Sequence, residues 1–100
     1  MSTKQLAQTV KDGRKLRFNF PSGDPLVGYL GGMDDYHWLV VTATSKHLIH
    51  KGNVTMVDIF SESTYDREMT DDMEAVIGPF RRYIDSNHEL FFGKPKAMAS

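Results

Sequence analysis

The sequence predicts a mainly β fold: a small, strongly bent five-stranded barrel with an N-terminal helix and a C-terminal helical extension. Three observations predict it. Short apolar segments alternate with turn residues from residue 15 to residue 60, as in small all-β barrels. Glycines interrupt the second of these segments, which is typical of a strand that bends sharply. Beyond residue 60, apolar residues recur at three- and four-residue spacing, which is the period of a helix.

A glycine separates the expected N-terminal helix from the first strand. Residues 3–11 favour a helix because their apolar side chains fall on one side, and Gly13 provides a stop signal. Apolar and polar residues then alternate over residues 15–20, as in a strand with one buried face. Residues 21–25 hold two prolines and a glycine, so we expect a turn there.

Four further strands follow, each bounded by turn residues. The second strand contains Gly28, Gly31 and Gly32, which predict a bulge or a bend within it. The aspartate pair at 34–35 and the pair Gly52-Asn53 mark tight turns. The expected strands cover residues 26–33, 36–43, 47–51 and 54–60.

The chain after residue 60 predicts a separate, helical part. Residues 61–70 are polar and predict a linker. The chain therefore divides into a barrel domain with its helix (1–60) and a linker with a helical extension (61–100), which we expect to pack on the barrel or on a neighbouring subunit. The apolar face of the extension is formed by Met73, Val76, Ile77, Phe80 and Ile84.

Local signals mark the start and the middle of this helix. Asp71 and Glu74 have the spacing of a capping box. Gly78-Pro79 should kink the helix or split it in two. We expect residues 93–100 to form a frayed tail.

Composition excludes several classes of protein. The chain has 100 residues, 40% of them hydrophobic and 25% charged, which is ordinary for a folded domain. A chain this short buries only about 60–65% of its unfolded surface, so size alone suggests oligomerisation. The absence of cysteine excludes disulfides and thiolate metal sites. No apolar run reaches the roughly 20 residues that cross a bilayer, and the first residues lack the apolar core of a signal peptide. We therefore expect a cytoplasmic protein with no membrane partner.

Catalysis is not expected from the motifs of the chain. No nucleophile elbow, phosphate-binding loop or dinucleotide fingerprint is present. His47 and His50 would point to opposite faces of a strand, which is unsuited to one metal ion. We expect no enzyme activity, no metal, no cofactor and no small-molecule substrate.

Two segments carry a more specific pattern. Residues 28–41 read GYLGGMDDYHWLVV: a glycine, alternating apolar residues, an aspartate, an aromatic residue two positions later and an apolar run. Residues 48–54 read LIHKGNV: an apolar pair, basic residues, glycine and asparagine before a β run. In this order and on this strand pattern, both segments resemble the two motifs of the Sm-like family of RNA-binding proteins, which includes the bacterial RNA chaperone Hfq. The resemblance covers residues 3–60.

The resemblance implies a ring. In Sm-like (SH3-like) barrels, the fourth strand of one subunit pairs with the fifth strand of its neighbour, so we expect a cyclic assembly of five to seven identical subunits. An open sheet edge must in any case be covered, and an identical neighbour can cover it. The residues expected at the subunit interface are Leu48, Val54, Val57 and Ile59.

The resemblance also implies a site for single-stranded, uridine-rich RNA at the pore of the ring, and a role as an RNA chaperone or in RNA metabolism. Tyr36 stands where the family stacks a base, and Lys51 would supply a cation toward base or phosphate. Asp35 stands where Hfq has a glutamine that contacts RNA. The complete candidate set is Asp35, Tyr36, His50, Lys51, Gly52 and Asn53.

A second interpretation, from another class of function, is a structural or adaptor ring that binds protein and whose RNA site is eroded. Trp38 stands where the family has a base-reading asparagine, and alternation predicts that it is buried. Asp35 would repel phosphate. The segment 61–100 carries five basic against eight acidic residues, a net charge of −3. The basic residues Lys11, Arg14, Lys15 and Arg17 could form a rim for RNA backbone or a solvated strand face.

Overall fold

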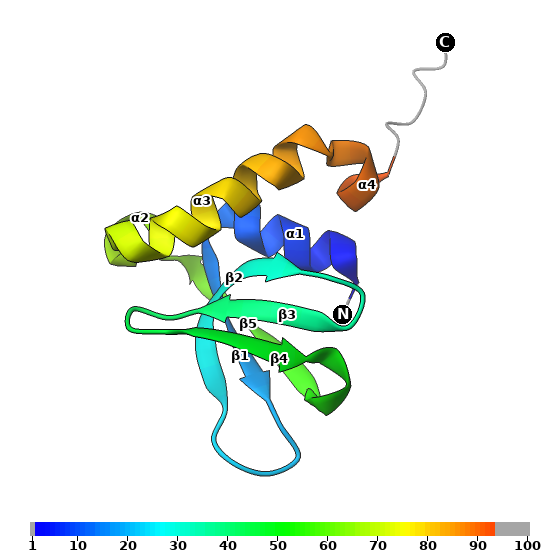
Figure 1. The fold of residues 1–100 in the computed structure, drawn as a ribbon, viewed down its shortest axis with the longest axis vertical. Helices are drawn as coiled ribbons and strands as arrows, with labels where there is room; N and C mark the ends of the chain where they lie inside the picture. The colour runs from blue at the N-terminus through cyan, green and yellow to red at the C-terminus, as the bar shows by residue number, and fades with distance from the viewer. Residues whose placement is uncertain (1, 94–100) are drawn as a thin grey trace.

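The computed structural model describes residues 2–93 and confirms the predicted fold class (Figure 1). Five antiparallel strands form one sheet in the order β4-β3-β2-β1-β5. Helices lie across one end of this sheet. The strands are β1 (Arg14–Asn19), β2 (Leu26–Met33), β3 (His37–Val41), β4 (Lys46–His50) and β5 (Met56–Ser63). The helices are α1 (Thr3–Asp12), the 3-10 turn η1 (Lys51–Asn53), α2 (Tyr65–Glu68), α3 (Asp71–Ser86) and α4 (His88–Phe92).

Strand β2 bends the sheet, as its glycines predict. Its first residues pair with β1 and its later residues pair with β3. The register with β3 shifts between Leu30 and Gly32, so Gly31 lies at a bulge. A Cβ atom at Gly31 would lie 2.7 Å from the Val41 side chain and 3.0 Å from that of Val76 on α3. Glycine therefore allows both β3 and α3 to approach the bend closely.

Helix α1 begins and ends with recognisable caps. Ser2 and Gln5 form a capping box at its start. Gly13 ends it in the left-handed conformation, with φ 69°. The carbonyl oxygen of Gly13 accepts the amides of Thr64 and Tyr65 over 3.0 and 3.1 Å. The end of α1 is thus joined directly to the segment that follows β5.

The predicted linker at 61–70 is wrong. Strand β5 continues to Ser63, pairing there with Arg14, and residues 65–68 form α2. Thr64 and Tyr65 are buried, and the Tyr65 hydroxyl donates to the Glu74 carboxylate on α3. The polarity of this segment suggested a linker. In the folded protein, however, the hydroxyl groups of Thr64 and Tyr65 form hydrogen bonds with Tyr29 and Glu74.

Helix α3 differs from its sequence signals at two points. Its N-cap is Thr70, whose hydroxyl accepts from the Met73 amide over 3.2 Å, and not Asp71. Pro79 lies inside the helix without splitting it, and α3 continues to Ser86. Because Pro79 has no backbone N–H, the carbonyl of Ala75 lacks its usual helical hydrogen bond. Ala75 is exposed, so water can bind this carbonyl instead.

The extension and the barrel share one hydrophobic core. Phe80, Ile84 and Phe91 from the extension belong to the same buried cluster as Leu6 of α1 and Leu16 of β1. A second cluster places Met73 and Ile77 of α3 against Tyr29, Val41 and Tyr65. Packing of the extension on the barrel of its own chain is therefore observed. Of the expected tail, residues 94–100 lie outside the described part of the chain.

Candidate nucleic-acid interface

Two turns meet at one end of strands β3 and β4. The Lys51 amide donates to the Tyr36 carbonyl over 2.8 Å, and Asp34 and His37 close the β2–β3 turn with a backbone hydrogen bond of 3.0 Å. The two motifs noted in the sequence therefore converge, bringing Asp35 and Tyr36 to the same end of the sheet as His50 and Lys51.

Asp34 holds the β2–β3 turn in place. Its Oδ1 atom accepts from the backbone amides of Tyr36 and His37 over 2.8 and 2.6 Å. The hydrogen bond from the Tyr36 amide is the main reason why the pKa of Asp34 is lowered. Asp34 thus remains charged, and its carboxylate accepts hydrogen bonds from the backbone of its own turn, as aspartate commonly does in turns.

Tyr36 lies in this turn rather than at the start of a strand, because β3 begins only at His37. Its side chain is 66% exposed. Trp38, two residues later, is buried as alternation predicts, and its ring lies 5.6 Å from that of Phe18. One aromatic residue of the motif therefore packs in the core while the other is open to a ligand.

The β4–β5 turn positions a histidine and a lysine. The Nδ1 atom of His50 accepts from the Gly52 amide over 2.9 Å, so a neutral His50 carries its proton on Nε2. The Nζ atom of Lys51 lies 5.7 Å from the centre of the Trp38 ring, within cation–π range. Gly52 and Asn53 are exposed in η1.

His37 belongs to this site, although the sequence analysis did not single it out. It is the cross-strand partner of His50, and the two rings meet edge to face with centres 5.3 Å apart. Its Nδ1 atom lies 3.2 Å from Asp34 Oδ1. The β3–β4 hairpin register would have revealed this pair, but that register depends on a loop whose length the sequence leaves open.

The expected basic rim is largely neutralised by carboxylates. Lys11 pairs with Asp85 at 3.2 Å, Lys15 with Glu68 at 2.8 Å and Arg17 with Asp58 at 2.8 Å. These distances favour the interpretation of a solvated, ion-paired face over that of an RNA-backbone rim.

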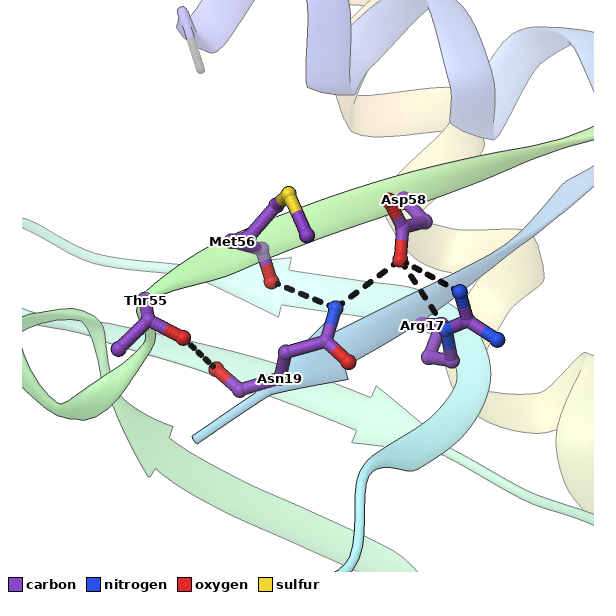
Figure 2. Close-up of polar contacts among 5 residues, drawn as sticks. All are labelled: Arg17, Asn19, Thr55, Met56 and Asp58. Atoms are coloured by element: carbon purple, nitrogen blue, oxygen red, sulfur yellow. Dashed lines mark hydrogen bonds and ion pairs between the residues drawn. The ribbon is translucent and has the colours of Figure 1, made fainter. Parts of the chain in front are cut away.

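Figure 2 shows how closely the Arg17–Asp58 pair is held. Asp58 accepts from both Nε and Nη2 of Arg17 and also from the Asn19 side chain, which donates in addition to the Met56 carbonyl. The Arg17 hydrogen bond is the main cause of the lowered pKa of Asp58. This network fastens β5 to β1 along the outer side of the sheet.

The four expected interface residues fall into two groups. Strands β4 and β5 are the two outer strands of the sheet within residues 2–93. Leu48 on β4 is 67% exposed and Ile59 on β5 is 37% exposed, so both can contact a neighbour. Val54 and Val57 are half-buried against the core of their own chain.

Neither a metal cluster nor a membrane span is found in the described part of the chain. Across residues 2–93, no three or more His, Asp or Glu side chains are grouped so that they could hold a metal ion. The helices of the same residues are too short or too polar to cross a bilayer.

Comparison with known proteins identifies the fold. No protein-family model matches the sequence, and no curated protein sequence matches it. Among solved structures, the chain is similar to a crystal structure of the pleiotropic translational regulator Hfq, with a TM-score of 0.53 and 19% sequence identity. The match covers 57% of this chain and 86% of that chain. At this identity the likeness concerns the fold alone: the chain has the Sm-like fold, a bent five-stranded barrel behind an N-terminal helix.

Proposed function

We propose that this protein binds single-stranded RNA at the joined β2–β3 and β4–β5 turns, as one subunit of a homo-oligomeric ring with a chaperone-like role. The observation that carries the proposal is the hydrogen bond between the Lys51 amide and the Tyr36 carbonyl. Through it, the backbone of Tyr36, whose ring is exposed, contacts that of Lys51, the neighbour of His50, at one end of a fold similar to that of Hfq.

The chemistry of this end suits RNA without any covalent step. A base can stack on the exposed Tyr36 ring, a contact that contributes about 1–3 kcal/mol per base. Lys51 supplies a cation toward a phosphate or a base edge, and the Nε2 proton of His50 supplies a further donor. Each subunit contributes a site of low affinity for RNA. Because a ring links several such sites, one RNA strand can contact several of them, which raises the overall affinity.

The outer strands support the ring. Strands β4 and β5 each present an edge without a partner strand among the described residues. Pairing β4 of one subunit with β5 of the next would satisfy both edges, and a contact between two different surfaces closes into a ring when its rotation allows. Leu48 and Ile59 would add apolar contacts along this seam.

A protein-binding adaptor ring is the second candidate, and one observation favours it. Lys11, Lys15 and Arg17 are paired with carboxylates, so little of their positive charge is free to attract a phosphate backbone. This function would use the same ring without the RNA site.

Native mass spectrometry with and without a short oligouridylate, at low and moderate salt, tests the proposal. We expect a ring that takes up RNA, and that takes up less RNA with a flatter salt dependence after Lys51→Ala. Lys46→Ala is the matched control, because it removes the same charge from the other end of β4 and should leave uptake unchanged. A ring that ignores both oligouridylate and oligoadenylate would favour the adaptor, and a monomer would contradict the assembly.

A further inference from the structure

A cavity of about 360 Å³ lies beside the proposed RNA site. Asp35 and Lys51 line it from the two turns, and the C-terminal extension supplies Tyr83 and Leu90. Its volume falls within the range of about 300–1,000 Å³ that is typical of pockets for small ligands. Two residues of the candidate RNA site therefore face the same space as two residues that belong to no motif of the sequence.

The wall formed by the extension is apolar and already ordered. The Tyr83 side chain is 50% exposed and Leu90 is 67% exposed. The Tyr83 ring meets the buried Phe91 ring edge to face at 83°, with centres 5.8 Å apart. Because the Tyr83 ring packs against the buried Phe91 ring while half of its side chain stays exposed, the exposed part offers an ordered surface on which a flat group can stack.

The wall formed by the turns is polar and carries both signs of charge. The Oδ1 atom of Asp34 accepts hydrogen bonds from the backbone amides of the turn. Asp35, in contrast, is exposed, and its side chain takes part in no hydrogen bond or ion pair within residues 2–93. The Asp35 carboxylate is therefore available as an acceptor in the wall of the cavity. A carboxylate attracts amino groups and repels carbonyl oxygens.

We propose that this cavity holds one base of the bound RNA strand and prefers a base with an exocyclic amino group, such as cytosine or adenine, over uracil. The base would stack on Tyr83 and donate its amino hydrogens to Asp35, while Lys51 contacts the adjoining phosphate. This inference rests on the proposed function, since Lys51 belongs to both sites. It assigns the C-terminal helices a part in reading RNA sequence.

The experiment measures fluorescence anisotropy of the ring with labelled oligouridylate and with a set of oligomers in which a single uridine is replaced by cytidine at each position in turn. We expect cytidine to strengthen binding about tenfold at each position that reaches one of the identical cavities of the ring, as a hydrogen bond to a charged group provides. Asp35→Asn should abolish that preference, because an amide both donates and accepts. Its effect on folding should be small, since Asp35 is exposed.

Variants of Tyr83 test the stacking wall. Tyr83→Leu should weaken binding of the preferred oligomer about tenfold, because it keeps an apolar side chain but removes the flat ring. Tyr83→Phe keeps the flat ring and should therefore restore the binding that Tyr83→Leu loses, which attributes the loss to stacking and not to the hydroxyl group. Equal affinity for all oligomers, or an unchanged affinity in Tyr83→Leu, would overturn this inference while RNA uptake through Lys51 still stands. If no oligomer binds at all, the proposed function fails as well and a protein occupant is favoured.

Discussion

The guanidinium of Arg81 donates to the backbone carbonyl of Lys11 over 2.9 Å. Lys11 lies in the last turn of α1, where carbonyl oxygens have no partner within the helix and the helix dipole is negative. The same guanidinium lies 4.3 Å from the centre of the Tyr65 ring. Arg81 of α3 therefore caps the end of α1 and contacts the first residue of α2. We expect the stability of the barrel to depend on this junction, which consists of Gly13, Tyr65 and Arg81.

Gly13→Ala tests the junction directly. A Cβ atom there would lie 2.6 Å from the Tyr65 Cβ atom, and the backbone has φ +69°. We expect a loss of more than about 1–3 kcal/mol, the usual cost of a non-glycine residue in this conformation, because a steric clash adds to it. Gly23→Ala is the control, with φ +88° and no atom within 4 Å of its Cβ. Thermal unfolding should show the larger fall in Tm for Gly13→Ala, and equal falls would contradict the close packing of Tyr65.

Phe91→Ala tests whether α4 belongs to the core. Phe91 is buried against Phe80, whereas its neighbour Leu90 is 67% exposed. We expect Phe91→Ala to lower the free energy of unfolding by about 3–5 kcal/mol, and Leu90→Ala to change it by less than about 0.5 kcal/mol. Urea unfolding measures both. Similar, small losses in the two variants would mean that α4 does not pack as described.

Charged residues on the outer strands test the ring. Leu48→Glu on β4 and Ile59→Glu on β5 would each bury an unpaired charge in the proposed seam, at a cost of several kcal/mol. We expect each variant to fold, since both side chains are exposed, and to shift toward monomer by native mass spectrometry. Val27→Glu introduces the same charge at a position that is 38% exposed on the inner strand β2 and should leave the ring mass unchanged. A folded double variant Leu48→Glu/Ile59→Glu with an unaltered ring mass would contradict the seam.

Acid should loosen the pairing of β1 with β5. Arg17 lowers the pKa of Asp58 below its ordinary value of 3.8, so the folded protein holds this carboxylate charged more readily than the unfolded chain does. The resulting stability is present above pH 3.8 and is lost as the pH falls through the folded-state pKa. We expect Asp58→Asn to be less stable than the unchanged protein at neutral pH, and the difference to narrow below pH 3.8.

Asp24→Asn provides the control for this pH experiment, since it removes a carboxylate from the exposed β1–β2 turn. Urea midpoints measured across the acid range should separate the two variants. A difference between Asp58→Asn and the unchanged protein that stays constant with pH would contradict the role of the Arg17 pair.

Local signals predicted the barrel well because each strand carries its own evidence. Alternation around Leu16 and Phe18 identified the buried face of β1, and the glycines of β2 identified the bulge at Gly31. The burial of Trp38 and the exposed turn around Lys51 followed from the same reasoning. These features are determined by residues that are close together in the sequence, so the sequence pattern predicts them.

The features that sequence analysis missed depend on long-range contacts. Residues 61–70 look like a linker until Tyr65 meets Gly13 and Glu74. Tyr83 lies at the edge of the apolar face of its helix, seven residues after Val76 and three after Phe80. Nothing local indicates that it lines a cavity together with residues of the β2–β3 turn, because that contact joins segments far apart in the sequence.

The packing of α4 against α1 also affects how the chain is made. Synthesis proceeds from the N-terminus, so Leu6 and Leu16 leave the ribosome long before Phe91, which shares their buried cluster. Until α4 emerges, the nascent chain exposes the apolar surface that Phe91 covers in the folded protein, and exposed apolar surface favours aggregation. The cluster around Leu6 and Leu16 can therefore be completed only after α4 has been synthesised.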